Sequence, residues 1–85
     1  MQPEYTKVGL ITHFYSKANV AIVDVLADIK KGDKITIRGS TTNISLAIES
    51  MEIEHGQVNE AHAGQKIGLK VPSRVRENDV VYKVP

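Results

Sequence analysis

The sequence predicts an all-β fold: a single six-stranded, Greek-key-like closed β-barrel that spans residues 1–85. Short segments of alternating apolar and polar residues are separated by turn-forming residues, which is typical of small barrels and sandwiches. A chain of 85 residues has room for one domain with one modest core. Six strands in so short a chain favour closure, because a closed barrel leaves no exposed sheet edge.

The first two strands are predicted on either side of a short turn at residues 16–19. The first strand, residues 7–14, places one alternating set of side chains inward: Val8, Leu10, Thr12 and Phe14. The second strand, residues 20–26, reads VAIVDVL and is apolar at nearly every position. A continuous apolar run of this length predicts a central strand that is covered on both faces.

The next turn, residues 28–33, leads into a cleanly alternating strand. Gly32 can adopt a positive φ there, and the Asp33 side chain can bond to the backbone. The strand at residues 34–38 reads KITIR and places Ile35 and Ile37 inward. A loop is expected over residues 39–43.

The stretch ISLAIESMEIEH, residues 44–55, contains a change of phase. The apolar residues of its two halves fall on opposite faces of an ideal strand: Ile44, Leu46 and Ile48 against Met51 and Ile53. A β-bulge at residues 49–50 would let one long bent strand keep both halves on the same core. A helix is the alternative, because some of these positions also fit helical spacing. The bent strand is favoured, since charged residues alternate around Ile53.

The remaining chain predicts two more strands between two long connections. Residues 55–64 are expected to form a polar loop anchored by Val58. The strand KIGLKV, residues 66–71, alternates strictly, with three residues inward: Ile67, Leu69 and Val71. Residues 72–78 form the second connection. The last strand, residues 79–84, is expected to turn three side chains inward: Val80, Tyr82 and Val84.

The composition excludes several classes of function. The chain has no cysteine, which excludes disulfides, thiolate metal sites and a cysteine nucleophile. Neither phosphate-binding glycine motif is present, so we expect no nucleotide site, and no serine lies in a G-x-S-x-G setting. The net charge of +1 argues neither for nor against nucleic acid. No secretory signal and no apolar run of about 18 residues occurs, so a cytoplasmic protein without membrane contact is expected.

Neither the histidines nor the acidic residues form a convincing chemical site. The spacing of His13, His55 and His62 matches no metal signature, although the latter two share a loop with acidic residues. Three further carboxylates are expected on a solvated strand face rather than in a catalytic cleft: Glu49, Glu52 and Glu54. We therefore predict no catalytic residue, no metal, no other cofactor and no enzymatic activity.

Two runs of basic residues remain as candidate binding residues. One run combines the fifth strand with the connection after it: Lys66, Lys70, Arg74 and Arg76. The other surrounds the third strand: Lys30, Lys31, Lys34 and Arg38. Clustered cations can bind phosphate groups, and Tyr15 is the best candidate to stack on a base, because Phe14 would point inward. The alternative is that these lysines and arginines keep a small barrel soluble and discourage edge pairing.

Three motifs resemble the second, β-barrel domain of translational GTPases of the elongation factor Tu type. They are KKGDKITIRG at residues 30–39, AHAGQKIGLKV at residues 61–71 and VRENDVVYKV at residues 75–84. The chain is also similar to small stand-alone proteins labelled translation elongation factor-like, and similar barrels end some collagenase-like peptidases. The family pattern has Gly-Asp where this chain has Asn78-Asp79, which is tolerable because asparagine also reaches the left-handed conformation.

The resemblance implies a barrel of the translation-factor domain II type without its GTPase domain. It implies a non-catalytic module that contacts RNA or the ribosome, but no contact residue of the family is matched in this chain. The candidate RNA-binding residues come from the basic run and the outward ring alone: Lys66, Lys70, Arg74, Arg76 and Tyr15. The alternative is a protein–protein interaction or accessory barrel, self-associating as a homodimer or serving a separately encoded enzyme. Apolar residues at positions expected to face outward motivate this alternative: Ile11, Ala21, Val23, Val25 and Val81.

Overall fold

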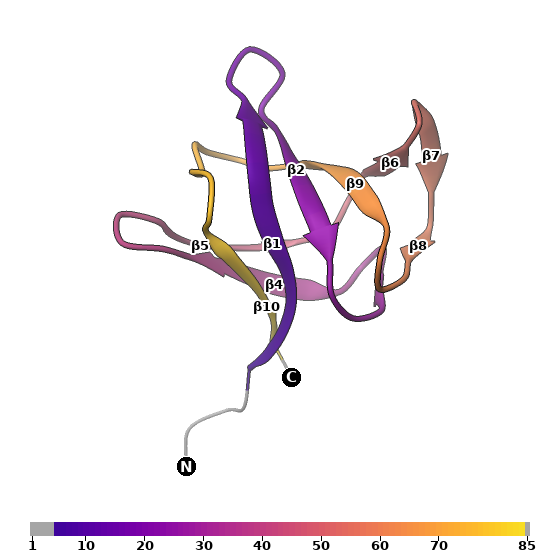
Figure 1. Cartoon of the computed structure of the whole chain (residues 1–85), viewed down its shortest axis with the longest axis horizontal. Helices are drawn as coiled ribbons and strands as arrows, with labels where there is room; N and C mark the ends of the chain where they lie inside the picture. The colour runs from indigo at the N-terminus through magenta and orange to yellow at the C-terminus, as the bar shows by residue number, and fades with distance from the viewer. Residues whose placement is uncertain (1–4, 85) are drawn as a thin grey trace.

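The computed structural model describes residues 5–84 and consists of strands and connections, which confirms the predicted all-β class (Figure 1). The ten strands are β1 (Thr6–Tyr15), β2 (Val20–Val25), β3 (Ile29–Lys30), β4 (Lys34–Arg38), β5 (Asn43–Ala47), β6 (Met51–Ile53), β7 (Gly56–Val58), β8 (Glu60–Ala61), β9 (Lys66–Lys70) and β10 (Val80–Lys83). The predicted domain limits, residues 1 and 85, lie outside the described residues. Within residues 5–84, no helix has the length and apolar character that a membrane span requires.

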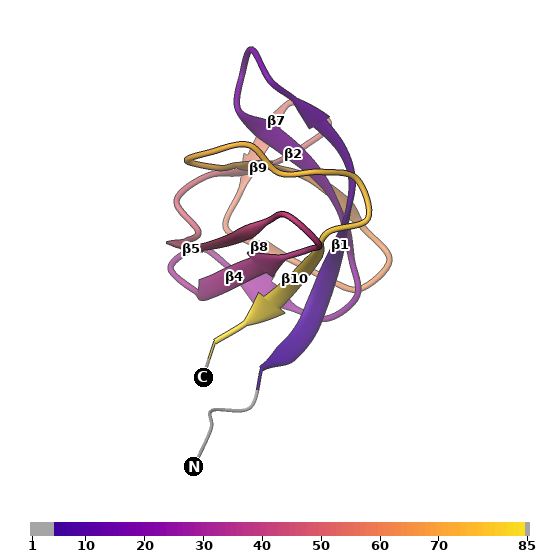
Figure 2. The same ribbon diagram turned by 90° about the vertical axis from the view of Figure 1, so that its left-hand side faces the viewer.

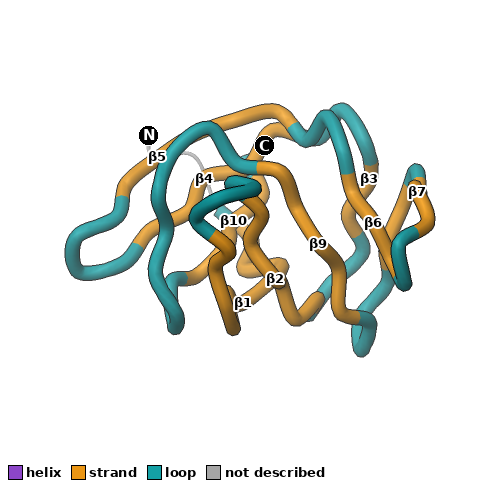
Figure 3. Tube along the Cα trace, turned by 90° about the horizontal axis from the view of Figure 1, so that it is seen from above, coloured by secondary structure: helices purple, strands orange, loops and turns teal. Residues whose placement is uncertain are grey.

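Eight strands form one antiparallel sheet in the order β5-β4-β10-β1-β2-β9-β6-β7, and β3 pairs with β8 as a separate ribbon. The sheet curls strongly around the core, as Figures 1 and 3 show. The curl brings β5 and β6, which stand far apart in the sheet order, close enough for residues 48–50 to join them. The sheet nevertheless has two ends, β5 and β7. The prediction of a closed six-stranded barrel is therefore wrong, and the fold is an open, curled sheet.

The phase change in residues 44–55 marks a break between two strands rather than a bulge in one strand. β5 pairs with β4, whereas β6 pairs with β9 and β7. Ile48 and Met51, on either side of the break, are both fully buried. The helical alternative is wrong as well. Both halves of the segment reach one core, as the sequence predicts. They do so because the strand pairing is interrupted at residues 48–50, not because a bulge bends one strand.

The predicted loop at residues 55–64 instead contains β7 and β8. The hairpin between β6 and β7 turns at Glu54 and His55, whose φ angles are 50° and 67°. Two consecutive positive φ angles are the geometry of a type I′ turn, for which Asn-Gly is the usual sequence. Glu54-His55 lacks that sequence signal, which is why the sequence predicts a loop here and not a hairpin.

Other turns follow the sequence closely. Gly32 and Gly64 have φ angles of 95° and 92°, and Asn78 has a φ angle of 74°. The Asp33 carboxylate accepts a hydrogen bond from the Lys30 backbone N–H at 2.9 Å, as expected for this turn. Asp33 also lies 3.3 Å from the Lys83 ammonium, which ties the turn to β10.

The core confirms the predicted inner faces of β4 and β9, agrees with that of β1 at Val8 and in part at Phe14, and contradicts that of β10. Ile35, Ile37, Ile67, Leu69 and Val71 are buried as predicted. In the predicted last strand, however, Val81 is buried, whereas the three residues predicted to point inward are only half-buried: Val80 and Tyr82 in β10, and Val84 just after it. The five apolar residues expected to face outward are all buried, so they supply no docking surface: Ile11, Ala21, Val23, Val25 and Val81.

Irregular pairing explains the wrong phase in β1. The register shifts between Lys7 and Gly9 against β10, and between Ile11 and His13 against β2. Each shift inserts a residue and moves the following side chains to the other face. Val8, Gly9 and Ile11 consequently point into the core, and Leu10 and Thr12 are half-buried.

Gly9→Ala is expected to lower the free energy of unfolding by about 1–3 kcal/mol, because overpacking a core displaces neighbouring side chains. A Cβ atom at Gly9 would lie 2.5 Å from Cγ1 of the buried Val23. At the exposed Gly56, a Cβ atom would meet only the Ile53 carbonyl at 3.4 Å, so Gly56→Ala is the matched control. Urea unfolding followed by circular dichroism measures both, and equal losses would contradict the close approach at Gly9.

Candidate functional site

The predicted stacking residue Tyr15 lies on the outer face of the curled sheet, at the end of β1. Tyr15 is opposite Val20 of β2, and Val20 is opposite Lys70 of β9. Tyr15 is 53% exposed, and with Lys66 it lines a hollow of about 470 Å³. Gly68 and Val20 also line this hollow. A Cβ atom at Gly68 would lie 3.3 Å from Val20 Cγ1, so a side chain there would take up part of the space. The structure therefore brings Tyr15, Lys66 and Lys70 to one face.

The other two predicted residues, Arg74 and Arg76, lie beside a different hollow. This hollow has a volume of about 390 Å³ and also contains Phe14, Val75 and Glu77. Val75, which the sequence did not single out, is buried and anchors the connection between β9 and β10. The five candidate residues are thus divided among three hollows: Tyr15 and Lys66 line one, Arg74 and Arg76 another, and Lys70 a third, beside β5.

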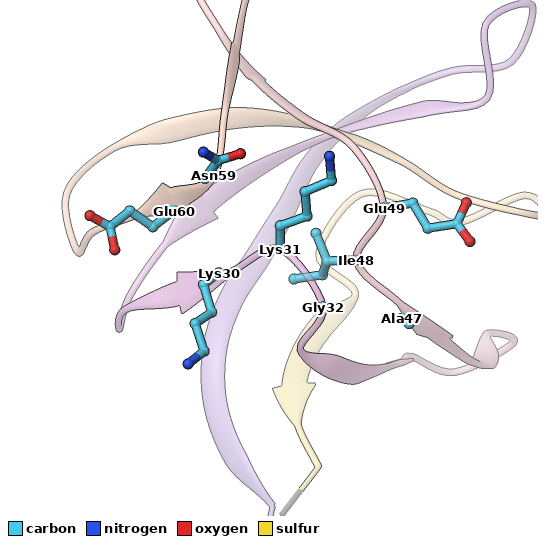
Figure 4. A pocket seen from close by; sticks show the side chains of 8 residues that line it. All are labelled: Lys30, Lys31, Gly32, Ala47, Ile48, Glu49, Asn59 and Glu60. Atoms are coloured by element: carbon cyan, nitrogen blue, oxygen red, sulfur yellow. The ribbon is translucent and has the colours of Figure 1, made fainter.

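The second basic run is divided as well. Lys30 and Lys31 line a hollow of about 620 Å³ together with Glu49 and Glu60, and Figure 4 shows the two lysine side chains pointing apart. The backbone N–H groups of Lys31 and Gly32 already donate to Asn59 and Ile48, at 2.7 and 2.8 Å. They are therefore not available to an anion. The other two basic residues of the run, Lys34 and Arg38, lie at opposite ends of β4.

The histidines occupy separate exposed positions. His62 Nδ1 lies 3.1 Å from Asp28 Oδ1, and His62 Nε2 lies 3.8 Å from Glu60 Oε1. His13 stands edge-on to the Tyr15 ring, with ring centroids 4.5 Å apart. In the part of the chain that the structure describes, no group of three or more His, Asp or Glu side chains is arranged to hold a metal ion.

The acidic residues of the fourth predicted strand are exposed, as expected for a solvated face. Of these, Glu52 accepts a hydrogen bond from Gln57 Nε2 at 2.8 Å across the β6–β7 hairpin. Among residues 5–84, the one acidic residue that is buried is Asp79, which is 4% exposed and whose carboxylate accepts a hydrogen bond from the Arg76 backbone N–H at 2.8 Å. The Asp79 side chain also packs against Gly39, which has no Cβ atom to obstruct it. These contacts give Asp79 a structural role.

The feature that the sequence reasoning missed is the end of the sheet at β5. The prediction of a closed barrel left no room for a free edge. Within the described residues, 5–84, β5 pairs only with β4, and hollows lie on both sides of it. The signal in the sequence is the composition of β5, NISLA, which lacks the charged and proline residues that usually protect an edge.

Comparison with known protein families identifies the chain's relatives. The family model described as peptidase family U32 C-terminal domain matches residues 3–81. An uncharacterized protease of Methanocaldococcus jannaschii is 39% identical over 77 residues, which covers 89% of this chain and 19% of that protein. A collagenase of Porphyromonas gingivalis is 31% identical over 80 residues, which covers 92% of this chain and 22% of that protein. The chain thus spans about a fifth of the length of these curated relatives.

A solved structure shows the same fold. The C-terminal domain of a putative U32 peptidase of Geobacillus thermoleovorans superposes with a TM-score of 0.86, at 22% sequence identity. The match covers 92% of this chain and 91% of that one.

These comparisons contradict the predicted relation to the second domain of elongation factor Tu. The motifs behind that prediction combine short alternating strands with turn residues, such as Gly32, Gly64 and Asn78, whose positive φ angles are needed by many small β-folds. The expected contact with RNA or the ribosome loses its basis with that relation. The family match leads instead to the collagenase-like peptidases: this chain belongs to the peptidase family U32 C-terminal domain family.

Proposed function

We propose that this chain is a non-catalytic accessory domain that acts beside a U32-type peptidase domain. The family match carries the proposal, because the matching model describes a C-terminal domain. The curated relatives are called a protease and collagenases, and the chain corresponds to about a fifth of each. Cleavage of peptide bonds is accordingly assigned to the part of the relatives that this chain does not cover.

We propose that the domain helps the peptidase to bind its substrate and that this substrate is a polypeptide. The names of the collagenase relatives support a protein substrate. The role agrees with the alternative drawn from the sequence, an accessory module for an enzyme. The sequence alternative assumed a separately encoded enzyme. In the relatives, by contrast, the matching segment and the rest of the protease or collagenase are one polypeptide.

A domain exchange tests this proposal. The segment of the Porphyromonas gingivalis collagenase that matches this chain is either deleted or replaced by the chain, and cleavage of fluorescein-labelled gelatin is followed. We expect the deletion to raise KM, the replacement to restore it, and the isolated chain to cleave nothing. A binding contribution predicts that KM changes more than kcat. Cleavage by the isolated chain, or identical KM values for all forms of the collagenase, would contradict the proposal.

A further inference from the structure

The backbone of β5 offers three outward-facing pairs of hydrogen-bonding groups. In an antiparallel ladder, alternate residues turn their N–H and C=O groups toward the same neighbour. The Gly39 N–H donates to the Thr42 carbonyl at 2.8 Å, and the Ile48 N–H donates to the Asp33 carbonyl at 2.9 Å. The pairing between these two bonds is continuous, so the backbone N–H and C=O groups of the even-numbered residues of β5 point toward β4. The backbone N–H and C=O groups of three residues therefore point away from β4: Asn43, Ser45 and Ala47. Residues 5–84 supply no strand that pairs with them.

This edge lacks the protection that natural sheets usually carry. Exposed edges are commonly interrupted by proline or a bulge, or carry charged side chains that prevent further pairing. β5 contains no proline and no charged residue, and its five residues pair with β4 in continuous register. At the other end of the sheet, β7 has only three residues. β5 is therefore the end at which another strand can be added.

Hollows beside the edge provide room for the side chains of an added strand. On the outer face, Ser45 and Ala47 line a hollow of about 330 Å³ with Tyr5, Lys34 and Val84. A second hollow, of about 370 Å³, lies between β5 and the end of β9. It is lined by Asn19, Leu46, Ala47, Glu49, Lys70, Val71 and Pro72. The connection after β9 begins on the open side of β5 (Figure 2), where Val71 and Pro72 line this hollow. Since successive side chains of a strand alternate between faces, an added strand can use both hollows.

We propose that the free edge of β5 binds an extended peptide by antiparallel strand addition. The peptide's backbone pairs with Asn43, Ser45 and Ala47, in the mode that peptide-binding domains use at exposed sheet edges. Its apolar side chains enter the hollow beside Leu46 and Val71. This inference goes beyond the accessory role, because it rests on the edge itself and not on the relation to peptidases.

Charge on the outer face selects acidic side chains at the alternate positions of the peptide. Within β4 and β5 the outer face carries Lys34 and Arg38 and no carboxylate. Lys34 lies opposite the small Ala47, so its side chain can extend across the edge. Arg38 lies opposite Asn43 and over the Tyr5 ring, with its Cζ atom 5.0 Å from the ring centroid. A second copy of the chain paired through β5 would bring like charges together, which an acidic peptide does not.

The test uses the full chain and a fluorescent peptide, acetyl-Thr-Val-Glu-Val-Glu-Val-Thr-amide, with binding followed by anisotropy. In antiparallel pairing, the glutamate N–H groups face β5 and the valine N–H groups face away. Methylating the two glutamate nitrogens should weaken binding about tenfold or more, because two backbone hydrogen bonds are lost. Methylating two valine nitrogens is the matched control, and this peptide should bind as the parent does.

A variant of the protein tests the same hydrogen bonds from the other side. Ala47→Pro removes an outward N–H without removing a bond to β4, and it should weaken peptide binding about tenfold. Ala47→Ser keeps the N–H and should bind normally, and thermal unfolding establishes that both variants fold. In the wild-type complex, the Ser45 and Ala47 amides should exchange more slowly with solvent.

Three results would overturn the proposal. One is the absence of binding at about 1 mM peptide, a concentration that reveals even weak complexes. Another is an equal effect of the two methylation patterns, which would show that the β5 hydrogen bonds are not involved. The third is a dimer in analytical ultracentrifugation that Ala47→Pro removes while the peptide does not bind. That result would assign the edge to a second copy of the chain.

Discussion

Leu69→Ala is expected to lower the free energy of unfolding by about 2–5 kcal/mol, because it removes a fully buried side chain and leaves a cavity. Leu69 lies in β9 opposite Ala21 of β2 and Met51 of β6, all three of them completely buried. It therefore packs where the central strands meet the far end of the sheet. Urea unfolding monitored by far-ultraviolet circular dichroism measures the change, and an unchanged m value shows that the loss belongs to the native state.

The neighbouring residue provides the control. Lys70 is exposed on the opposite face of the same strand, so Lys70→Ala is expected to change the free energy of unfolding by no more than about 0.5 kcal/mol. Ile67→Ala should resemble Leu69→Ala, since both residues share the inner face. A larger loss at Lys70 than at Leu69 would mean that the strand is turned with its other face to the core.

The strands that the sequence predicts well are those in which charge accompanies alternation. β4 reads KITIR and β9 reads KIGLK, and each has a charged residue at both ends on one phase. A charged side chain is seldom buried, so its position decides which phase faces the core. The predicted bounds of β4 also agree with the structure, because Gly32 and Gly39 interrupt the alternating pattern on either side of the strand.

The strands that the sequence predicts poorly have apolar residues on both phases or carry irregular pairing. β10 reads VVYK, so alternation does not choose between Val80 and Val81. Tertiary pairing makes the choice, because Val81 is opposite Gly9 and Ile37 on the inner face. In β1 the two register shifts depend on the pairing with β10 and β2, and no residue type in the β1 sequence predicts them.

The candidate site illustrates a similar limit. A run of basic residues in the sequence predicts one binding surface only if the fold brings its members to one place. Here the turn after β9 carries Arg74 and Arg76 to a different hollow from that of Tyr15 and Lys66. Whether β5 lies at an edge depends on the order of all strands in the sheet, because a strand is an edge strand when only one other strand pairs with it. Within residues 5–84, only β4 pairs with β5. Only the three-dimensional arrangement reveals either feature.

Val81→Asp is expected to destabilise the fold by at least about 4 kcal/mol, because a carboxylate without a charged partner would be buried in the core. Val81 is 1% exposed and lies opposite Gly9 and Ile37, which offer no side-chain hydrogen bond. The variant should be largely unfolded at room temperature, because a loss of this size approaches the whole stability of a small domain. Circular dichroism and susceptibility to proteolysis provide the measurement.

Val80→Asp, one residue away, is the matched test of the strand's orientation. Val80 is half-buried on the outer face, opposite Leu10 of β1 and Arg38 of β4. A carboxylate there keeps contact with water and lies across the ladder from a guanidinium group, so a loss of about 1 kcal/mol or less is expected. The two substitutions introduce the same charge in the same strand, and they differ only in the face that receives it. If Val80→Asp unfolded the chain and Val81→Asp did not, the alternating assignment with Val80, Tyr82 and Val84 inward would be correct, and the pairing of β10 with β1 and β4 would have to shift by one residue.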